Sequence, residues 1–163
     1  FREPRHNQTP ESPGNEYPLR SPFDILRRIG GMVYAEVSHL SCNYLNADRI
    51  PFDLAIVPMD RPVAEARDVT PFFDRAEANR CTSVLFERNH PDGDLVPAPG
   101  EFQLINRLIL SAQFRKVEFL DYVIYGLQQD DEVAALSVRQ KLQEKDAVFR
   151  DAMAGTAAKQ LQL

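Results

Sequence analysis

The sequence predicts an α/β domain with an extended arm before it and a charged helix after it. Short apolar runs typical of buried strands alternate along the chain with segments of helical periodicity, which is the pattern of helices packed on a sheet. Hydrophobic residues make up 44% and charged residues 26% of the 163 residues, the ordinary balance of a globular chain. We place the arm at residues 1–20, the domain at 21–128, and the C-terminal helix and tail at 129–163.

Turn and capping residues predict the arm and the first elements. Residues 1–20 hold four of the twelve prolines, and this composition buries too little apolar surface to order itself without a partner. A helix is expected to begin at Ser21-Pro22, with serine as the cap and proline in the first turn, and to end at Gly30-Gly31. Two strands follow, from about Val33 to Leu45 and from Phe52 to Pro58.

The middle of the chain alternates between helices and strands. Thr70-Pro71 opens a helix that is expected to run to about Arg80. The short apolar run at 82–86 is typical of a buried central strand. Apolar residues then recur on one face of a helix at about 100–114, and a last strand is expected at 117–125.

Residues 130–154 have the composition of a charged helix. Its apolar seam consists of Ala135, Val138, Leu142, Phe149 and Met153. One interpretation is that this seam folds back on the domain. The alternative is that the helix docks on another chain, because the heptad spacing 135-142-149 suits a short two-helix contact. In that case the contact residues are Val138, Leu142, Phe149 and Met153.

Charge and cysteine content narrow the classes of partner. The net charge of −5 gives no overall positive field toward nucleic acid or an anionic membrane, although a local basic patch is compatible with it. Cys42 and Cys81 lie in apolar runs without CxxC spacing, which predicts buried, reduced thiols and a cytoplasmic location. No apolar stretch approaches the ~18 residues that span a bilayer, so we expect no membrane partner.

Seven basic residues that we single out are scattered over several predicted elements. We interpret them as solvated residues with acidic partners. The alternative is a patch along helix ends that contacts phosphates. The residues concerned are Arg27, Arg28, Arg75, Arg80, Arg107, Arg115 and Lys116.

The run from Arg88 to Glu101 carries the clearest functional signal. It reads Arg-Asn-His-Pro-Asp-Gly-Asp-Leu-Val-Pro-Ala-Pro-Gly-Glu. This resembles the JAMM motif of JAB/MPN metalloproteases in the RadC-like form, which is His-x-His, seven residues, Ser, two residues and Asp. The spacing is kept, with Arg88, His90, Ala98 and Glu101 at the four motif positions. The resemblance covers about residues 33–126, and near its end Tyr122 replaces a family histidine.

The resemblance implies a mixed sheet flanked by helices and, in active members, zinc-dependent hydrolysis. A catalytic zinc needs three protein ligands and an open position for water. Arg88 cannot be a ligand, because a guanidinium stays protonated and offers only donors. Ala98 lacks the hydroxyl that in this family helps to hold the oxyanion. The place of the family's general-base glutamate falls on Ser38, with Glu36 two residues away on the same face of the predicted strand.

These substitutions predict a site without catalytic residues, metal or other cofactor. We expect Arg88 and Glu101 to form an ion pair in the place of zinc, and the side chains are compatible with bidentate geometry. We interpret His90 as a hydrogen-bonded structural residue. The alternative is a zinc-dependent metallopeptidase. Its residues would be Glu36, His90 and Glu101, with His39 or Asp94 as a further ligand.

The sequence therefore favours a catalytically inactive RadC-like JAB/MPN domain, a pseudoenzyme that serves as a protein-interaction or scaffold subunit. We expect a protein partner or oligomer to contact the N-terminal arm and the C-terminal helix. The resemblance also suggests a DNA-repair-related or mobile-element complex, in which nucleic acid is met through the larger assembly. A nucleic-acid-binding module is the second alternative, after the zinc hydrolase.

Overall fold

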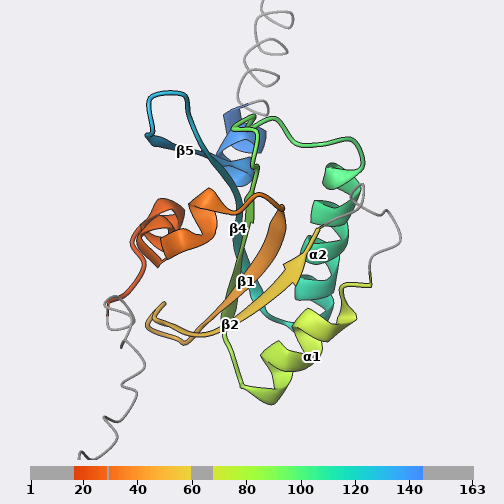
Figure 1. Cartoon of the computed structure of the whole chain (residues 1–163). Helices are drawn as coiled ribbons and strands as arrows, with labels where there is room; N and C mark the ends of the chain where they lie inside the picture. The colour runs from red at the N-terminus through yellow and green to blue at the C-terminus, as the bar shows by residue number, and fades with distance from the viewer. Residues whose placement is uncertain (1–16, 29, 60–67, 145–163) are drawn as a thin grey trace, which may run out of the picture.

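The chain forms one five-stranded sheet with helices on both faces (Figure 1). A computed structural model describes residues 17–28, 30–59 and 68–144. The elements in chain order are the 3-10 helices η1 (Pro22–Arg28) and η2 (Gly30–Tyr34), strands β1 (His39–Leu45) and β2 (Pro51–Pro58), helix α1 (Thr70–Ala78), strand β3 (Ser83–Asn89), helix α2 (Glu101–Arg115), and strands β4 (Glu118–Leu127) and β5 (Val133–Ser137).

The sheet is mixed, as the sequence predicts, and its strand order is β2-β1-β3-β4-β5. β1 is antiparallel to both β2 and β3, and β5 is antiparallel to β4. β3 and β4 are parallel, and α2 forms the crossover between them. The C-terminal end of β3 and the N-terminal end of α2 therefore lie near each other at the middle of the sheet.

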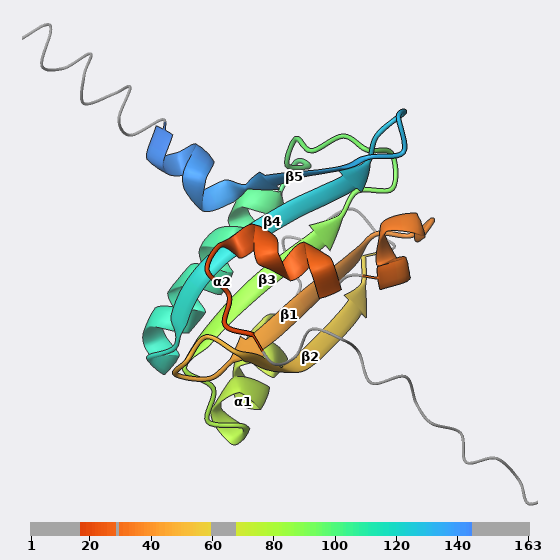
Figure 2. The ribbon, with the colours of Figure 1, turned by 90° about the vertical axis from the view of Figure 1, so that its left-hand side faces the viewer.

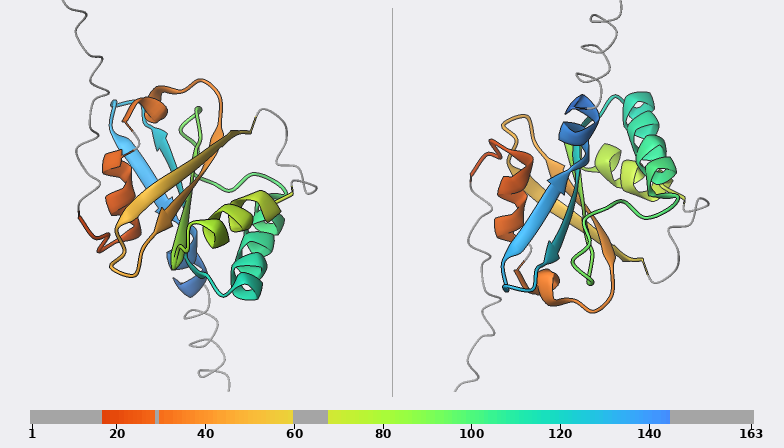
Figure 3. Two further views of the ribbon diagram at one scale, coloured as in Figure 1. Left: turned by 90° about the horizontal axis from the view of Figure 1, so that it is seen from below. Right: turned by 90° about the horizontal axis from the view of Figure 1, so that it is seen from above.

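Two apolar cores lie on the two faces of the sheet. Helices α1 and α2 cover one face, and η1 lies across the other (Figures 2 and 3). The larger core lies under the two α-helices and includes Phe73, Phe86 and Leu108. The smaller core lies under η1 and includes Ile25 and Val123. Alternate residues of the central strands thus contribute to opposite cores.

The predicted strand at 33–45 is wrong in its first half. Gly30–Tyr34 forms the 3-10 helix η2, and β1 begins only at His39. The neighbouring strands explain this boundary, because β2 ends at Pro58, which pairs with His39, and β3 ends at Asn89. Within the described ranges, no strand extends far enough to pair with the residues before His39. The predicted first helix is likewise present only as the 3-10 helix η1.

The predicted C-terminal helix is wrong over its first eight residues, 130–137. Residues 133–137 form strand β5 rather than the start of a helix, and helix begins at Val138. Alanine and leucine favour helix, but pairing with the free edge of β4 overrides that local preference. The sheet thus continues past the predicted domain boundary at residue 128. Ala135 belongs to β5 and packs against the smaller core.

The predicted contact residues of the C-terminal helix divide into two groups. Val138 is buried in the larger core, as expected if the seam folds back on the domain. Leu142 is exposed. Phe149 and Met153, like arm residues 1–16, lie outside the described residues.

Two further sequence predictions can be compared with the structure. Cys42 and Cys81 are free and buried, as predicted. Within the described ranges, no helix has both the length and the apolar character needed to cross a lipid bilayer.

Candidate functional site

Four polar side chains meet in a buried cluster at the end of β3. Arg88 is the penultimate residue of β3, His90 follows the strand, Glu101 is the first residue of α2, and Tyr122 lies in β4. All four side chains are buried. Tyr122 pairs with Phe86 in the parallel β3–β4 register, so Tyr122 and Arg88 lie on the same face of the sheet, beneath α2. We call Arg88, His90, Glu101 and Tyr122 the polar cluster.

The Glu101 carboxylate is the centre of the polar cluster. Its Oε1 accepts hydrogen bonds from Arg88 Nη1 and from the Tyr122 hydroxyl, both at 2.7 Å. Its Oε2 accepts a hydrogen bond from the backbone N–H of Ala98 at 2.7 Å. His90 Nε2 lies 3.7 Å from Oε2, which is an ion-pair distance rather than a hydrogen bond.

The partners of Glu101 keep it ionised although it is buried. Burial alone would raise the pKa of this carboxyl, but the nearby His90 imidazole, the Arg88 cation, and the hydrogen bonds from Tyr122 and Ala98 outweigh that effect and lower the pKa to about 2. For His90, burial lowers the pKa, whereas the Glu101 carboxylate and the Asp94 carbonyl raise it above 6.5 on balance. His90 Nδ1 is hydrogen-bonded to that carbonyl.

The predicted ion pair between Arg88 and Glu101 is present, but it is not bidentate. Only Nη1 of Arg88 bonds the carboxylate. Nε donates instead to the hydroxyl of Ser38 at 2.9 Å, and that hydroxyl donates to the Asn89 carbonyl at 2.7 Å. The guanidinium is thereby shared between Glu101 and the segment before β1, so a second bond to the carboxylate is replaced by one to Ser38.

Two glycines hold the loop between β3 and α2 in place. Gly93 has φ +77°, and a Cβ there would lie 2.6 Å from the Leu127 carbonyl oxygen. A Cβ on Gly126 would lie 2.8 Å from the carbonyl oxygen of His90. His90 N also donates to the Tyr125 carbonyl at 2.8 Å. The backbone of the loop therefore packs directly on β4, which fixes the position of His90.

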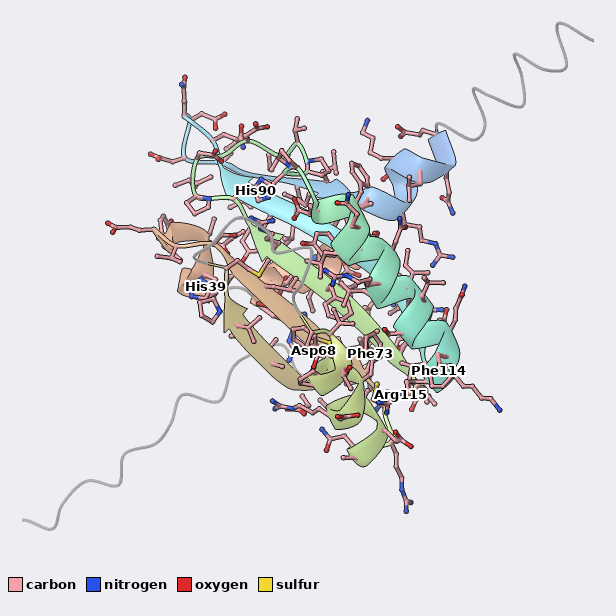
Figure 4. The ribbon with its side chains drawn as sticks, turned by 90° about the vertical axis from the view of Figure 1, so that its right-hand side faces the viewer. His39, Asp68, Phe73, His90, Phe114 and Arg115 are labelled. Atoms are coloured by element: carbon pink, nitrogen blue, oxygen red, sulfur yellow. The ribbon has the colours of Figure 1, made fainter. Side chains whose placement is uncertain are left out.

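Of the residues of the hydrolase alternative, only His90 and Glu101 belong to the polar cluster. Glu36 is exposed in the segment before β1. Figure 4 shows His39 at the start of β1 and His90 beyond the end of β3. Leu40 faces the larger core together with Phe86, so strand alternation turns His39 toward the opposite face. The Asp94 side chain is exposed and accepts a hydrogen bond from Val96 N at 3.0 Å.

The donor set of the polar cluster does not fit zinc. Of the four motif positions, only His90 and Glu101 carry groups that can ligate a metal, and both oxygens of Glu101 already accept protein hydrogen bonds. No group of three or more histidine, cysteine, aspartate or glutamate side chains within the described ranges is arranged to hold a metal ion. The Arg88 cation lies where a further ligand would be needed, so the arrangement opposes a divalent cation electrostatically.

Sequence reasoning did not assign Tyr122 to the site. The only signal was that tyrosine stands where the family pattern has a histidine. The Tyr122 hydroxyl is buried and donates to the same oxygen as Arg88. Arg88 and Tyr122, which stand at two family histidine positions, therefore both bond Oε1 of Glu101. This shared partner becomes apparent only when β3, β4 and α2 are placed together.

Comparisons with known proteins agree with the fold. A family model of the RadC-like JAB domain matches residues 59–143, slightly more than half of the chain. A UPF0758 protein of Bacillus cereus strain G9842 is 28% identical over 116 residues, which make up 69% of this chain and 50% of the relative. UPF0758 proteins of Bacillus mycoides and Chloroflexus aggregans are 27% and 23% identical, with the same shares covered. The chain spans about half the length of the relatives it matches.

The family match includes every element that builds the polar cluster: β3, the loop after it, α2 and β4. It also reaches past β5, in agreement with the sheet that continues beyond residue 128. The chain therefore belongs to the RadC-like JAB domain family.

Proposed function

We propose that this chain is a catalytically inactive RadC-like JAB domain that serves as a protein-interaction or scaffold subunit. The observation that carries the proposal is the buried ion pair between Arg88 and Glu101, at two of the motif's metal-ligand positions. A fixed cation about 4 Å from a metal site opposes each unit of metal charge by roughly 4 kcal/mol at an effective dielectric near 20. The substitution therefore disfavours zinc and also removes one ligand.

The remaining catalytic groups are also missing from their places. Ser38 holds the position assigned to the general base, and its hydroxyl is engaged with Arg88 and Asn89. Ala98 contributes only a backbone N–H, which donates to Glu101. Activation of water requires a base within hydrogen-bond reach, and an acyl-transfer oxyanion requires preorganised donors. Neither requirement is met by these two residues.

An interaction role is supported by apolar surface on α2. Phe114 is 83% exposed and Leu110 is 63% exposed, one helical turn apart on the outer face of the helix. Large exposed apolar side chains that lie together are typical of contact surfaces. We propose further contacts at the N-terminal arm and the C-terminal helix, and a role within a DNA-associated or mobile-element complex, for which the resemblance to RadC-like proteins is the support.

Metal analysis of the full chain tests the absence of a zinc centre. After purification without chelator and dialysis against buffer, we expect far less than one zinc per chain and no hydrolysis of peptide or isopeptide substrates. One equivalent of zinc that survives dialysis would refute the proposal. The combined variant R88H/A98S/E101D/Y122H serves as the positive control for zinc retention, because it restores the family residues at these four positions.

Light scattering of the full chain tests the interaction role. If the C-terminal segment mediates self-association, the variants Phe149→Ser and Met153→Ser lower the measured mass, whereas Gln143→Ser on the same segment leaves it unchanged. A monomeric mass for the unsubstituted chain at all concentrations would rule out self-association and leave a different protein as the partner.

A further inference from the structure

A concave site lies on the face of the sheet opposite the polar cluster. It is a groove of about 470 Å³ between the start of η1, the turn joining β1 to β2, and the first turn of the C-terminal helix. Figure 2 looks onto this face of the molecule. Phe23, Leu85 and Leu120 supply apolar lining, and Arg20, Arg49 and Arg139 supply positive charge. We call this the arginine groove.

The three arginines come from three separate segments of a chain whose net charge is −5. Among the described residues that line the groove, Asp121 is the one acid. Its Oδ1 accepts hydrogen bonds from the backbone N–H groups of Tyr122 at 2.7 Å and Arg139 at 3.0 Å, and its Oδ2 accepts one from the Ser137 hydroxyl. Its charge is therefore engaged in holding the start of the C-terminal helix against β4.

The acids next to the groove leave the arginines largely available. Asp24 accepts hydrogen bonds from the backbone of Arg20 and Ser21, at 2.9 and 3.0 Å. Glu118 pairs with Arg49 at 3.1 Å, but both side chains are more than half exposed, so this pair is weak and open to exchange.

Arginine N–H donors remain for a ligand. Arg139 Nη1 donates to the Leu120 carbonyl at 3.0 Å, which ties this guanidinium to the wall of the groove. The exposed Arg20 guanidinium lies close enough to Asp24 to help lower the pKa of that carboxyl, but within the described residues no side-chain hydrogen bond engages its N–H donors. Each guanidinium carries five N–H donors in a planar fork that matches phosphate oxygens.

We propose that the arginine groove binds a phosphorylated ligand with a planar apolar body, the chemistry of a nucleotide. Its volume lies within the roughly 300–1,000 Å³ typical of small-ligand sites. Phosphate oxygens are bound by Arg20, Arg49 and Arg139, while the apolar body packs against Phe23 and Leu120. The combination of arginines with an aromatic side chain also occurs in sites for single-stranded nucleic acid. The source of the ligand is thus a free mononucleotide or one nucleotide of a strand.

None of the basic residues singled out from the sequence lines this groove. Two of those residues are paired with acids elsewhere: Arg75 with Asp53 at 2.6 Å, and Arg115 with Asp74 at 2.6 Å. The arginine groove is also independent of the polar cluster, because it lies on the other face of the sheet. A positive or a negative binding result at the arginine groove therefore does not test the proposed function of the polar cluster.

Titrations of the full chain followed by amide NMR test the proposal. The probes are adenosine monophosphate, adenosine, inorganic phosphate and a short single-stranded DNA. We expect the monophosphate to shift the amides of residues 19–21, 23 and 137–143 and to bind at least about tenfold more tightly than adenosine or phosphate. Tighter binding of the DNA than of the monophosphate, with a steep salt dependence, would assign the strand as the source. Equal affinities would assign the free nucleotide.

Matched variants separate a built site from general charge attraction. Arg20→Gln and Arg49→Gln change exposed side chains, and together they should weaken monophosphate binding by about a hundredfold. Arg75→Gln removes the same charge on the other face and should leave the affinity unchanged. Equal weakening by Arg75→Gln, equal affinity for phosphate and monophosphate, or no amide shift with any probe would each overturn the proposal.

Discussion

Replacement of Arg88 by methionine is the most direct test of the polar cluster. Methionine keeps much of the length and volume of the side chain but removes the charge and the donors. The change deletes the 2.7 Å bond to Glu101 and the 2.9 Å bond to Ser38, and both lie beneath α2. It leaves a fully buried carboxylate with a backbone N–H, a tyrosine hydroxyl and His90 as its remaining partners.

The size of the effect follows from the pKa of Glu101. The surroundings lower that pKa from 4.5 to about 2. At about 1.4 kcal/mol for each tenfold change in the acidity constant, the ionised carboxylate is stabilised by about 3 kcal/mol in the folded state. Removal of one partner from a buried ion pair generally costs about 3–5 kcal/mol, because the other charge is left without compensation. We therefore expect Arg88→Met to lower the free energy of unfolding by about 3 kcal/mol.

Urea unfolding at pH 7 measures this change, and a double-mutant cycle identifies its cause. In Arg88→Met/Glu101→Gln the stranded charge is gone, so the double variant should be more stable than the sum of the single changes predicts, by at least about 1 kcal/mol. Arg75→Met is the control, because it breaks a surface pair with Asp53 and should cost less than about 1 kcal/mol. Additive effects, or a loss below about 1 kcal/mol for Arg88→Met, would show that the ion pair does not hold the loop and α2 together.

Four further changes follow from the same geometry. Because the pKa of Glu101 is depressed to about 2, its stabilisation is complete above pH 4.5 and should disappear as the pH falls from 4.5 toward 2, measured by urea unfolding at each pH. Burial raises the pKa of Glu87 from 4.5 to about 7, so the charged form of this side chain opposes folding at higher pH. Glu87→Gln should therefore raise the unfolding free energy by about 1–3 kcal/mol at pH 8, and it should change that free energy little at pH 5. Tyr122→Phe should cost about 1.5–3 kcal/mol, since it removes a hydrogen bond to a buried charge, and a neutral result in thermal unfolding would argue against that bond. Gly126→Ala should displace the loop, because its Cβ would meet the His90 carbonyl at 2.8 Å, and the histidine NMR signals should move.

The parts of the fold that sequence predicts best are those with strong local signals. Thr70-Pro71 marks the start of α1, and the apolar stripe of α2 gives its extent within one residue at each end. Pairing partners, by contrast, are not encoded locally. β1 begins at His39 because neither β2 nor β3 extends further, and residues 133–137 become a strand because the edge of β4 is open to them. Both errors arise from neighbours that are distant in the sequence.

The candidate site shows the same division between local and tertiary information. Motif spacing alone places Arg88 and Glu101 together, and their ion pair is present. Spacing does not reveal how the guanidinium divides its donors, since Ser38 lies 50 residues away and is brought to Arg88 by the β1–β3 pairing. The arginine groove was missed for a related reason. Its three arginines stand in three unrelated segments, and no periodicity connects them.

The polar cluster is best understood as one interlocked set of substitutions. Arg88 alone would give Glu101 a counter-charge but would leave further lone pairs of a buried carboxylate unsatisfied, at a penalty of about 1–3 kcal/mol or more for a charged group. Tyr122 satisfies the same oxygen, and the Ala98 N–H satisfies the other. Return of a histidine at position 88 alone would therefore face a carboxylate that is still bonded by two donors. Because the donors share one acceptor, they stabilise the loop jointly, and a change at any one of them alters what the others contribute.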